Sequence, residues 1–194
     1  MKTLRGFSLI ELIIGMAILG ILMSLAMPSF SGWIRNAKIR TTAESIQNGL
    51  QLARAEAVRR NTTARFQLVS TLDSACALAA AGPNWVVSLD NVAGNCDDAP
   101  SDTVAPRIIQ LRNGAEGADN NTIIAAGQSA FTFNGMGRLT PIPAANIAID
   151  ISNPTAGNCV AAGGSIRCLR LVVSLGGQIR MCDPALPSND AQAC

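Results

Sequence analysis

The feature of this 194-residue sequence that most constrains its fold is an apolar run near the N-terminus, from Phe7 to Phe30. Residues 7–27 are about long enough to cross the hydrocarbon core of a bilayer as an α-helix. The one charged residue inside the run is Glu11, and a carboxylate in a membrane helix costs roughly 2.5 to 3.5 kcal/mol. We therefore predict a membrane helix in which Glu11 has a partner.

The residues around the apolar run predict its orientation. Lys2 and Arg5 precede the run, which places the N-terminal end in the cytoplasm by the positive-inside rule. No small-residue cleavage site follows the run, so we expect the anchor to be retained and the rest of the chain to lie across the membrane. Pro28 is expected to kink or end this first helical segment.

A second helical pattern begins near Trp33. Apolar residues recur at spacings of three and four, which places them on one stripe of a helix. We predict one helix from Phe7 to Arg60, about 80 Å long if continuous, with its second half packed on a globular head. The stripe consists of Ile39, Ala43, Ile46, Leu50, Ala53 and Ala57.

The remainder of the chain reads as β-structure. Short segments rich in Val, Ile and Phe are separated by Gly, Pro, Asn and Asp, which is typical of strands and turns. Gly176 and Gly177 are predicted to form a two-residue hairpin turn. The predicted strands are Ala64–Val69, Asn84–Leu89, Arg107–Leu111, Thr122–Ala126, Ala130–Phe133, Ile147–Ile151, Ile166–Leu175 and Gln178–Cys182.

The six cysteines all follow the apolar run, and none forms a CxxC pair. An even number on one side of a membrane anchor indicates disulfides in an oxidising compartment, with six unpaired buried thiols as the alternative. Six cysteines allow 15 connectivities. Sequence neighbours favour Cys76–Cys96, Cys159–Cys168 and Cys182–Cys194, the last of which ties down the C-terminus.

Composition argues against catalysis. The chain contains no histidine, which excludes Ser-His-Asp and Cys-His nucleophiles and HExxH zinc sites. Lys2 and Arg5 account for the formal charge of +2, so bulk charge does not indicate a nucleic-acid binder. A calcium site is an alternative interpretation of four aspartates, but a solvated acidic turn is favoured. We predict no enzyme activity, catalytic residue, metal site or cofactor. The four aspartates are Asp90, Asp97, Asp98 and Asp102.

The segment GFSLIE, residues 6–11, resembles the cleavage motif of type IV prepilins and type II secretion pseudopilins. The resemblance implies cleavage after Gly6 and N-methylation of Phe7. It also implies that Glu11 meets the positive N-terminus of an adjacent subunit, because a close opposite charge offsets much of the cost of burial. The expected divisions are a leader (1–6), a transmembrane half-helix (7–30), an amphipathic half-helix (31–61) and a β-rich periplasmic head (62–194).

Four later segments resemble the GspH/FimT group of minor pilins and pseudopilins: Leu50–Asn61, Asn84–Val87, Phe131–Arg138 and Gly177–Pro184. The resemblance implies an α+β fold, with a long N-terminal helix on a disulfide-stapled head of antiparallel sheets. It implies a subunit of a type IV pilus or type II secretion pseudopilus that helps to prime or cap the filament. The implied partners are other pilins, the prepilin peptidase, the inner-membrane assembly platform and, before assembly, the lipid of the bacterial inner membrane.

DNA capture during natural transformation is the alternative function. Some FimT-like pilins bind DNA through arginines in a C-terminal Gly-Arg-x-Arg motif. Here the corresponding residues are Gly177 to Arg180, with glutamine in place of the first arginine. The candidate DNA contacts are Arg167, Arg170 and Arg180. Because Arg167 and Arg170 are three residues apart, they are expected on opposite faces of a regular strand.

Overall fold

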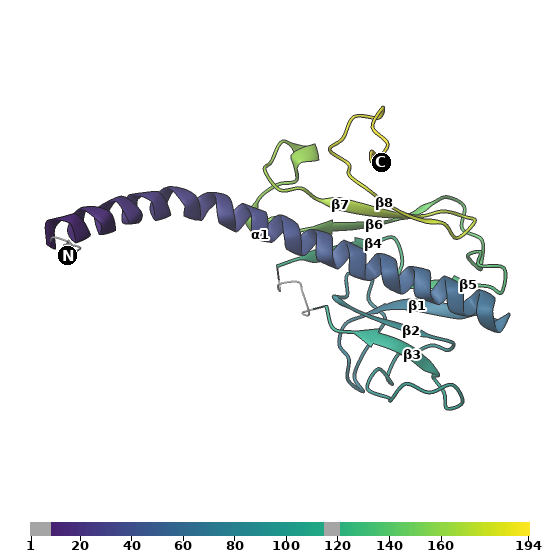
Figure 1. Ribbon diagram of the computed structural model, residues 1–194. Coiled ribbons are helices and arrows are strands. Elements are labelled where there is room, and N and C mark those ends of the chain that lie inside the picture. Colours follow the sequence, from purple (N-terminus) through teal and green to yellow (C-terminus); the bar gives the residue numbers. More distant parts are fainter. Residues whose placement is uncertain (1–8, 115–120) are drawn as a thin grey trace, which may run out of the picture.

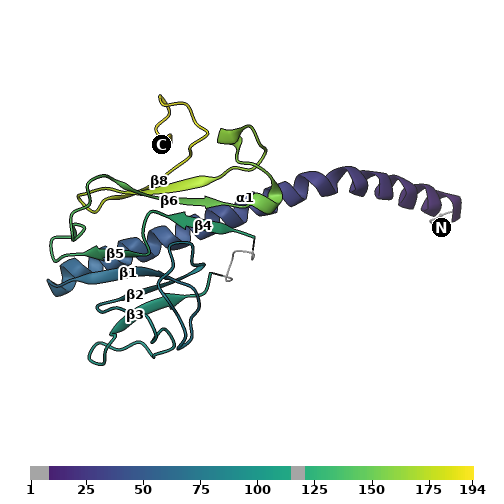
Figure 2. The same ribbon diagram turned by 180° about the vertical axis from the view of Figure 1, so that it is seen from behind.

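A single long helix organises the molecule. The computed structural model describes residues 9–114 and 121–194. Helix α1 (Leu9–Arg60) is 52 residues long. Its N-terminal part projects away from the head, and its second half lies across the sheets (Figure 1). Seen from behind, β6 and β8 lie above the line of this helix and β2 and β3 lie below it (Figure 2).

The head contains two four-stranded antiparallel sheets. One has the strand order β3-β2-β1-β5 and the other the order β4-β6-β7-β8. The strands are β1 (Ala64–Val69), β2 (Asn84–Ser88), β3 (Ile108–Arg112), β4 (Ile123–Ala126), β5 (Ala130–Phe133), β6 (Ile147–Ser152), β7 (Leu169–Val173) and β8 (Ile179–Cys182), with 3₁₀ turns η1 (Pro154–Ala156) and η2 (Val160–Ala162) between β6 and β7.

The apolar stripe of α1 forms the centre of the core. Every member of the stripe predicted from the sequence is at most 1% exposed. Phe66 packs between Trp85 and Phe131, with ring centroids 5.6 and 6.1 Å away. The indole Nε1 of Trp85 donates to Ser45 Oγ on the helix at 3.0 Å. The expected α+β architecture, a helix packed on antiparallel sheets, is therefore confirmed.

Helix α1 continues through Pro28, so of the two expected effects, a kink or an end, the end does not occur. A proline removes one backbone hydrogen bond, and the bonds of neighbouring turns sustain the helix; its N-terminal half is gently curved (Figure 1). The helix ends one residue before Asn61, which has a φ of 49°. The amides of Asn61 and Thr62 donate to Val58 O and Ala57 O, both at 3.2 Å. This pair of bonds is a Schellman motif.

Two details near the C-terminus differ from the sequence-based expectation. Strand β7 begins at Leu169 rather than Ile166, because Ile166 bridges to Cys159 and the backbone amide of Arg167 donates to Asn36 on α1. The β7–β8 connection is a three-residue loop, since Ser174 N donates to Gln178 O at 2.9 Å. Gly177, with a φ of 77°, supplies the left-handed residue that such a loop requires.

Two disulfides close loops of the head, and a third joins the C-terminal tail to β8. The structure contains Cys76–Cys96, Cys159–Cys168 and Cys182–Cys194. These are the neighbour pairs that the order of cysteines favours. The first lies in a small core of its own beside β2 and β3. The last holds the C-terminal tail beside β8, where Asp183 N donates to Gln192 O at 2.8 Å.

Candidate functional site

The residues expected to direct processing lie at the extreme N-terminus. Gly6 and Phe7 fall outside the described residues, so cleavage and methylation remain predictions. Glu11 lies exposed in the first turns of α1. Apolar side chains surround it on all sides of the helix, with exposed fractions between 53% for Ile14 and 81% for Leu9. This half of α1 is therefore apolar all round without a covering layer from the described part of the head.

The structure does not establish a membrane span. In the ranges 9–114 and 121–194, no helix combines the length and apolar character needed to cross a membrane. The transmembrane assignment of residues 7–30 therefore stays a prediction.

Two of the three candidate DNA-contact arginines are held by carboxylates. Arg170 donates through Nε to Asp150 Oδ1 at 2.7 Å and through a terminal nitrogen to Oδ2 at 3.2 Å. This pairing raises the pKa of the Arg170 guanidinium. Arg167 Nε donates to Asp183 Oδ2 at 2.5 Å. Arg180 is exposed and has no ion pair within the described ranges.

The fold places two of these arginines on one face of a sheet and the third beside the helix. Arg170 lies opposite Cys182, and Arg180 lies opposite Val172. Residues paired across antiparallel strands share a face, so Arg170 and Arg180 lie together on the face of the sheet away from α1. Arg167 precedes β7 and lies beside the helix, where its amide meets Asn36. Arg167 and Arg170 were expected on opposite faces of a strand, and their different positions are consistent with this. The three arginines do not form one patch.

A second group of arginines surrounds the C-terminal end of α1. Glu56 accepts from Arg59 at 2.6 and 3.0 Å and from Arg60 at 2.8 Å. The hydrogen bond from Arg59 is the main reason why the pKa of Glu56 lies below its ordinary value. Arg54 Nε donates to Gly137 O at 3.1 Å and fixes the turn after β5 to the helix. These contacts hold the C-terminal end of α1 against the head.

The aspartates considered for calcium have other partners or do not converge. Asp90 forms a two-bond pair with Arg107, at 2.6 and 2.8 Å, which lowers the pKa of Asp90. Asp102 accepts from Arg60 at 2.5 Å. Among the residues that the structure describes, no group of three or more metal-binding side chains is present. The calcium alternative gains no support.

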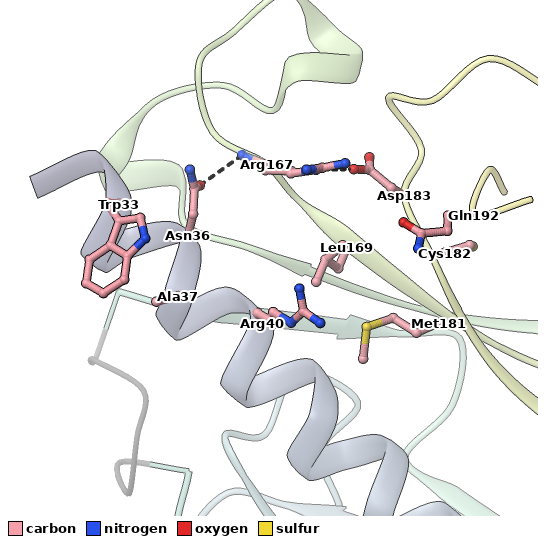
Figure 3. A pocket seen from close by; sticks show the side chains of 10 residues that line it. All are labelled: Trp33, Asn36, Ala37, Arg40, Arg167, Leu169, Met181, Cys182, Asp183 and Gln192. Atoms are coloured by element: carbon pink, nitrogen blue, oxygen red, sulfur yellow. Dashed lines mark hydrogen bonds and ion pairs between the residues drawn. The ribbon is translucent and has the colours of Figure 1, made fainter. Parts of the chain in front are cut away.

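A groove that sequence reasoning missed lies between α1 and the C-terminal strands (Figure 3). Its volume is about 670 Å³. Helix α1 contributes residues at positions 33, 36, 37 and 40, which share one helical face, and the opposite wall comes from the region of β7, β8 and the tail. Local sequence patterns could not predict that these two walls meet, because their residues are far apart in the chain: Asn36 and Arg167 are separated by 131 positions. The lining residues are Trp33, Asn36, Ala37, Arg40, Arg167, Leu169, Met181, Cys182, Asp183 and Gln192.

Comparison with known proteins finds one family model, one N-terminal motif and similar solved structures. A model of the type II transport protein GspH matches residues 42–177, and a prokaryotic N-terminal methylation motif matches residues 1–27. No curated protein matches the chain.

Two crystal structures of the type IV minor pilin FimU from Pseudomonas aeruginosa resemble this chain at 18% identity. The structure in space group P21 has a TM-score of 0.50 and covers 80% of this chain and 94% of that one. The structure in space group P65 has a TM-score of 0.48, with 80% and 98% covered. At this identity, the likeness establishes a pilin-like fold and nothing more specific.

Proposed function

This chain belongs to the family of the type II transport protein GspH, and from that membership we propose that it is a structural subunit that helps to prime or cap a filament. The filament is a type IV pilus or a type II secretion pseudopilus. Before assembly, the subunit is held in the bacterial inner membrane with its head in the periplasm. Its partners are other pilins, the prepilin peptidase and the inner-membrane assembly platform.

The observation that carries the proposal is the division of α1 into two unlike halves. Residues 39–57 bury their stripe in the head, whereas the residues from Leu9 to Met23 expose apolar side chains around the helix. An exposed apolar surface of this extent requires another partner. Lipid supplies it before assembly, and the helices of other subunits supply it in the filament.

Glu11 is proposed to align the apolar helix of one subunit with that of its neighbour along the filament axis. It is the one charged residue between Phe7 and Phe30. In the low dielectric of a helix bundle, an unpaired carboxylate is costly, and a nearby amino terminus offsets much of that cost. We propose that Glu11 meets the methylated terminus of Phe7 from a neighbouring subunit. The pairing sets the axial position of each subunit.

Two substitutions test processing and assembly separately. Gly6→Ala is expected to leave the leader attached, so that the mass of the mature chain is not observed. Glu11→Ala is expected to be cleaved normally but to enter filaments poorly. Glu44→Ala is the matched control, because Glu44 is an exposed acid on the same helix whose ion pair, among the described residues, is with Arg40 of that helix. Normal filament incorporation of the Glu11 variant would contradict the pairing.

DNA binding in natural transformation is the competing function. Its support here is Arg180, which is exposed and lies next to the β7–β8 loop. Arg170 and Arg167 each share their charge with a carboxylate, Asp150 and Asp183, whereas Arg180 has no ion pair in the described ranges, so DNA contact is expected to depend most on Arg180. Salt-dependent DNA binding by the full chain, lost in Arg180→Ala, would favour a DNA receptor. Absence of binding at low salt would leave assembly as the function.

A further inference from the structure

The groove beside Trp33 differs chemically from the rest of the head surface. Ala37, Leu169 and Met181 give it an apolar lining, and Arg40 and Arg167 add two guanidinium groups. Figure 3 shows Arg40 extending from α1 toward the strands and Arg167 extending along the opposite wall toward Asp183. An apolar lining with cations beside it suits an amphiphile that has an anionic head.

The two guanidinium groups of the groove keep N–H donors that their own ion pairs leave unused. Asp183, with a side chain only 5% exposed, already accepts from Arg167 Nε and from the amide of Ala185 at 2.8 Å. The side chains of Arg40 and Arg167 are 73% and 57% exposed. Their ion pairs use Nε, at 2.9 Å from Glu44 and 2.5 Å from Asp183. A guanidinium has five N–H donors, so its terminal nitrogens remain to contact an anion.

The groove is continuous with the exposed apolar half of α1. Trp33 forms one end of it, is 66% exposed, and stacks on Phe30 with ring centroids 5.9 Å apart. Along α1, the order is therefore apolar residues, then two aromatic rings, then Arg35, Lys38 and Arg40. No acidic residue lies between Glu11 and Glu44. The same order describes hydrocarbon, interface and headgroups across one side of a bilayer.

We propose that this groove binds an anionic phospholipid of the surrounding membrane, with Arg40 and Arg167 at the phosphate and Trp33 and Ala37 against the upper acyl chain. The inference rests on the proposed function, since it requires the unassembled subunit to be membrane-anchored. Lipid is favoured over an acidic peptide because the groove opens beside a helix that is apolar all round. The bound lipid fixes the head against the membrane surface until assembly removes it.

Tryptophan fluorescence gives a direct test with a built-in reference. The chain has two tryptophans: Trp33 is exposed, whereas Trp85 is 3% exposed in the core. The full-length protein is reconstituted in phosphatidylcholine nanodiscs that contain a minority of brominated phosphatidylglycerol or, separately, brominated phosphatidylcholine. Bromine quenches a tryptophan that it approaches closely, so Trp33 reports the groove and Trp85 supplies the unquenched signal.

The expected result is a preference for the anionic lipid that depends on the arginines. Half-maximal quenching should need a lower mole fraction of brominated phosphatidylglycerol than of brominated phosphatidylcholine. Each arginine that contacts the phosphate should lower that mole fraction by a factor of about five. Arg40→Gln should remove about one such factor, and Arg40→Lys should restore most of it. Arg59→Gln is the matched control, because Arg59 is exposed at the opposite end of the helical part of the head. Near-ultraviolet circular dichroism verifies that each variant is folded.

Equal quenching by the two lipids would overturn the proposal, as would a preference that survives Arg40→Gln combined with Arg167→Gln. Protection of Trp33 by an acidic segment of another pilin in the same nanodiscs would also overturn it and assign the groove to a protein partner. Retention of the wild-type chain in nanodiscs is scored separately. Failure of retention counts against the proposed membrane anchoring, whereas retention without lipid preference counts only against the groove.

Discussion

Gly49 provides a sensitive test of how closely α1 packs on the sheets. It lies inside the helix, where alanine is ordinarily more favourable than glycine by about 1 kcal/mol. A Cβ at this position would come within 2.7 Å of Phe66 Cε2 and 3.2 Å of Trp85 Cε3. The Phe66 ring cannot retreat easily, because it is fully buried between Trp85 and Phe131.

We therefore expect Gly49→Ala to destabilise the protein despite the gain in helix propensity. Overpacking of a close-packed core costs about 1–3 kcal/mol. Against a propensity gain of about 1 kcal/mol, the net loss is about 1 kcal/mol. For a chain of this length, that loss lowers Tm by about 2–4 °C.

Thermal melting of the full-length protein in detergent, followed by near-ultraviolet circular dichroism, measures this change because Trp85 reports core packing. Gly32→Ala is the matched control: it is a glycine of the same helix whose added Cβ would meet nothing within 4 Å. Its Tm should be unchanged or slightly higher. A Gly49→Ala variant that melts at or above the wild type would refute the close approach of helix and aromatic rings.

Three further outcomes are expected in the same melting assay. Cys194→Ser should lose about 3 kcal/mol, the chain-entropy value for a loop of this size, and expose the C-terminal tail to proteases while the tail of the wild type resists them. Gly177→Ala should lower Tm more than Gly176→Ala, because only Gly177 has a left-handed φ and an added Cβ there would collide with Gly137 O. The hydrogen bond from Arg59 lowers the pKa of Glu56 in the folded state. Ionised Glu56 therefore stabilises the fold at pH values above its unfolded-state pKa of about 4. This stabilisation is lost as the pH falls through the lower pKa of the folded state. Glu56→Gln should flatten that acid-side fall in Tm, and an unchanged pH profile would count against the pairing.

Local periodicity explains why much of the fold follows from the sequence. The stripe from Ile39 to Ala57 repeats at helical spacing, and the structure buries every member. Strand β1 has the predicted bounds, because Ala64–Val69 is a compact β-prone run between polar residues. The predicted beginning of β7 is wrong because Ile166, an apolar β-branched residue, bridges to Cys159 instead of extending the strand. Here a tertiary contact overrides the local pattern.

The candidate sites were harder to predict from the sequence than the fold, because they depend on contacts between residues far apart in the chain. The sequence offers Arg167, Arg170 and Arg180 only as candidate DNA contacts for the alternative function, and no local pattern indicates that Asp183 and Asp150 pair with the first two. The groove was missed for the same reason, because its two walls are far apart in the chain and meet only in the folded head. Glu11, in contrast, is conspicuous in the sequence because one charge in an apolar run is costly wherever the helix inserts.

The buried stripe of α1 also determines how the head responds to mechanical force. From Ile39 to Ala57 it extends for about 27 Å along the helix axis. Tension applied to the N-terminal end of α1 acts parallel to this contact, so it loads the interface in shear rather than peeling it one residue at a time. The disulfides all close loops within the head, and none joins it to α1. When the helix is pulled, all contacts of the packed stripe therefore bear the load together. The peptide chain that leaves the helix at Asn61 is the covalent link between helix and head.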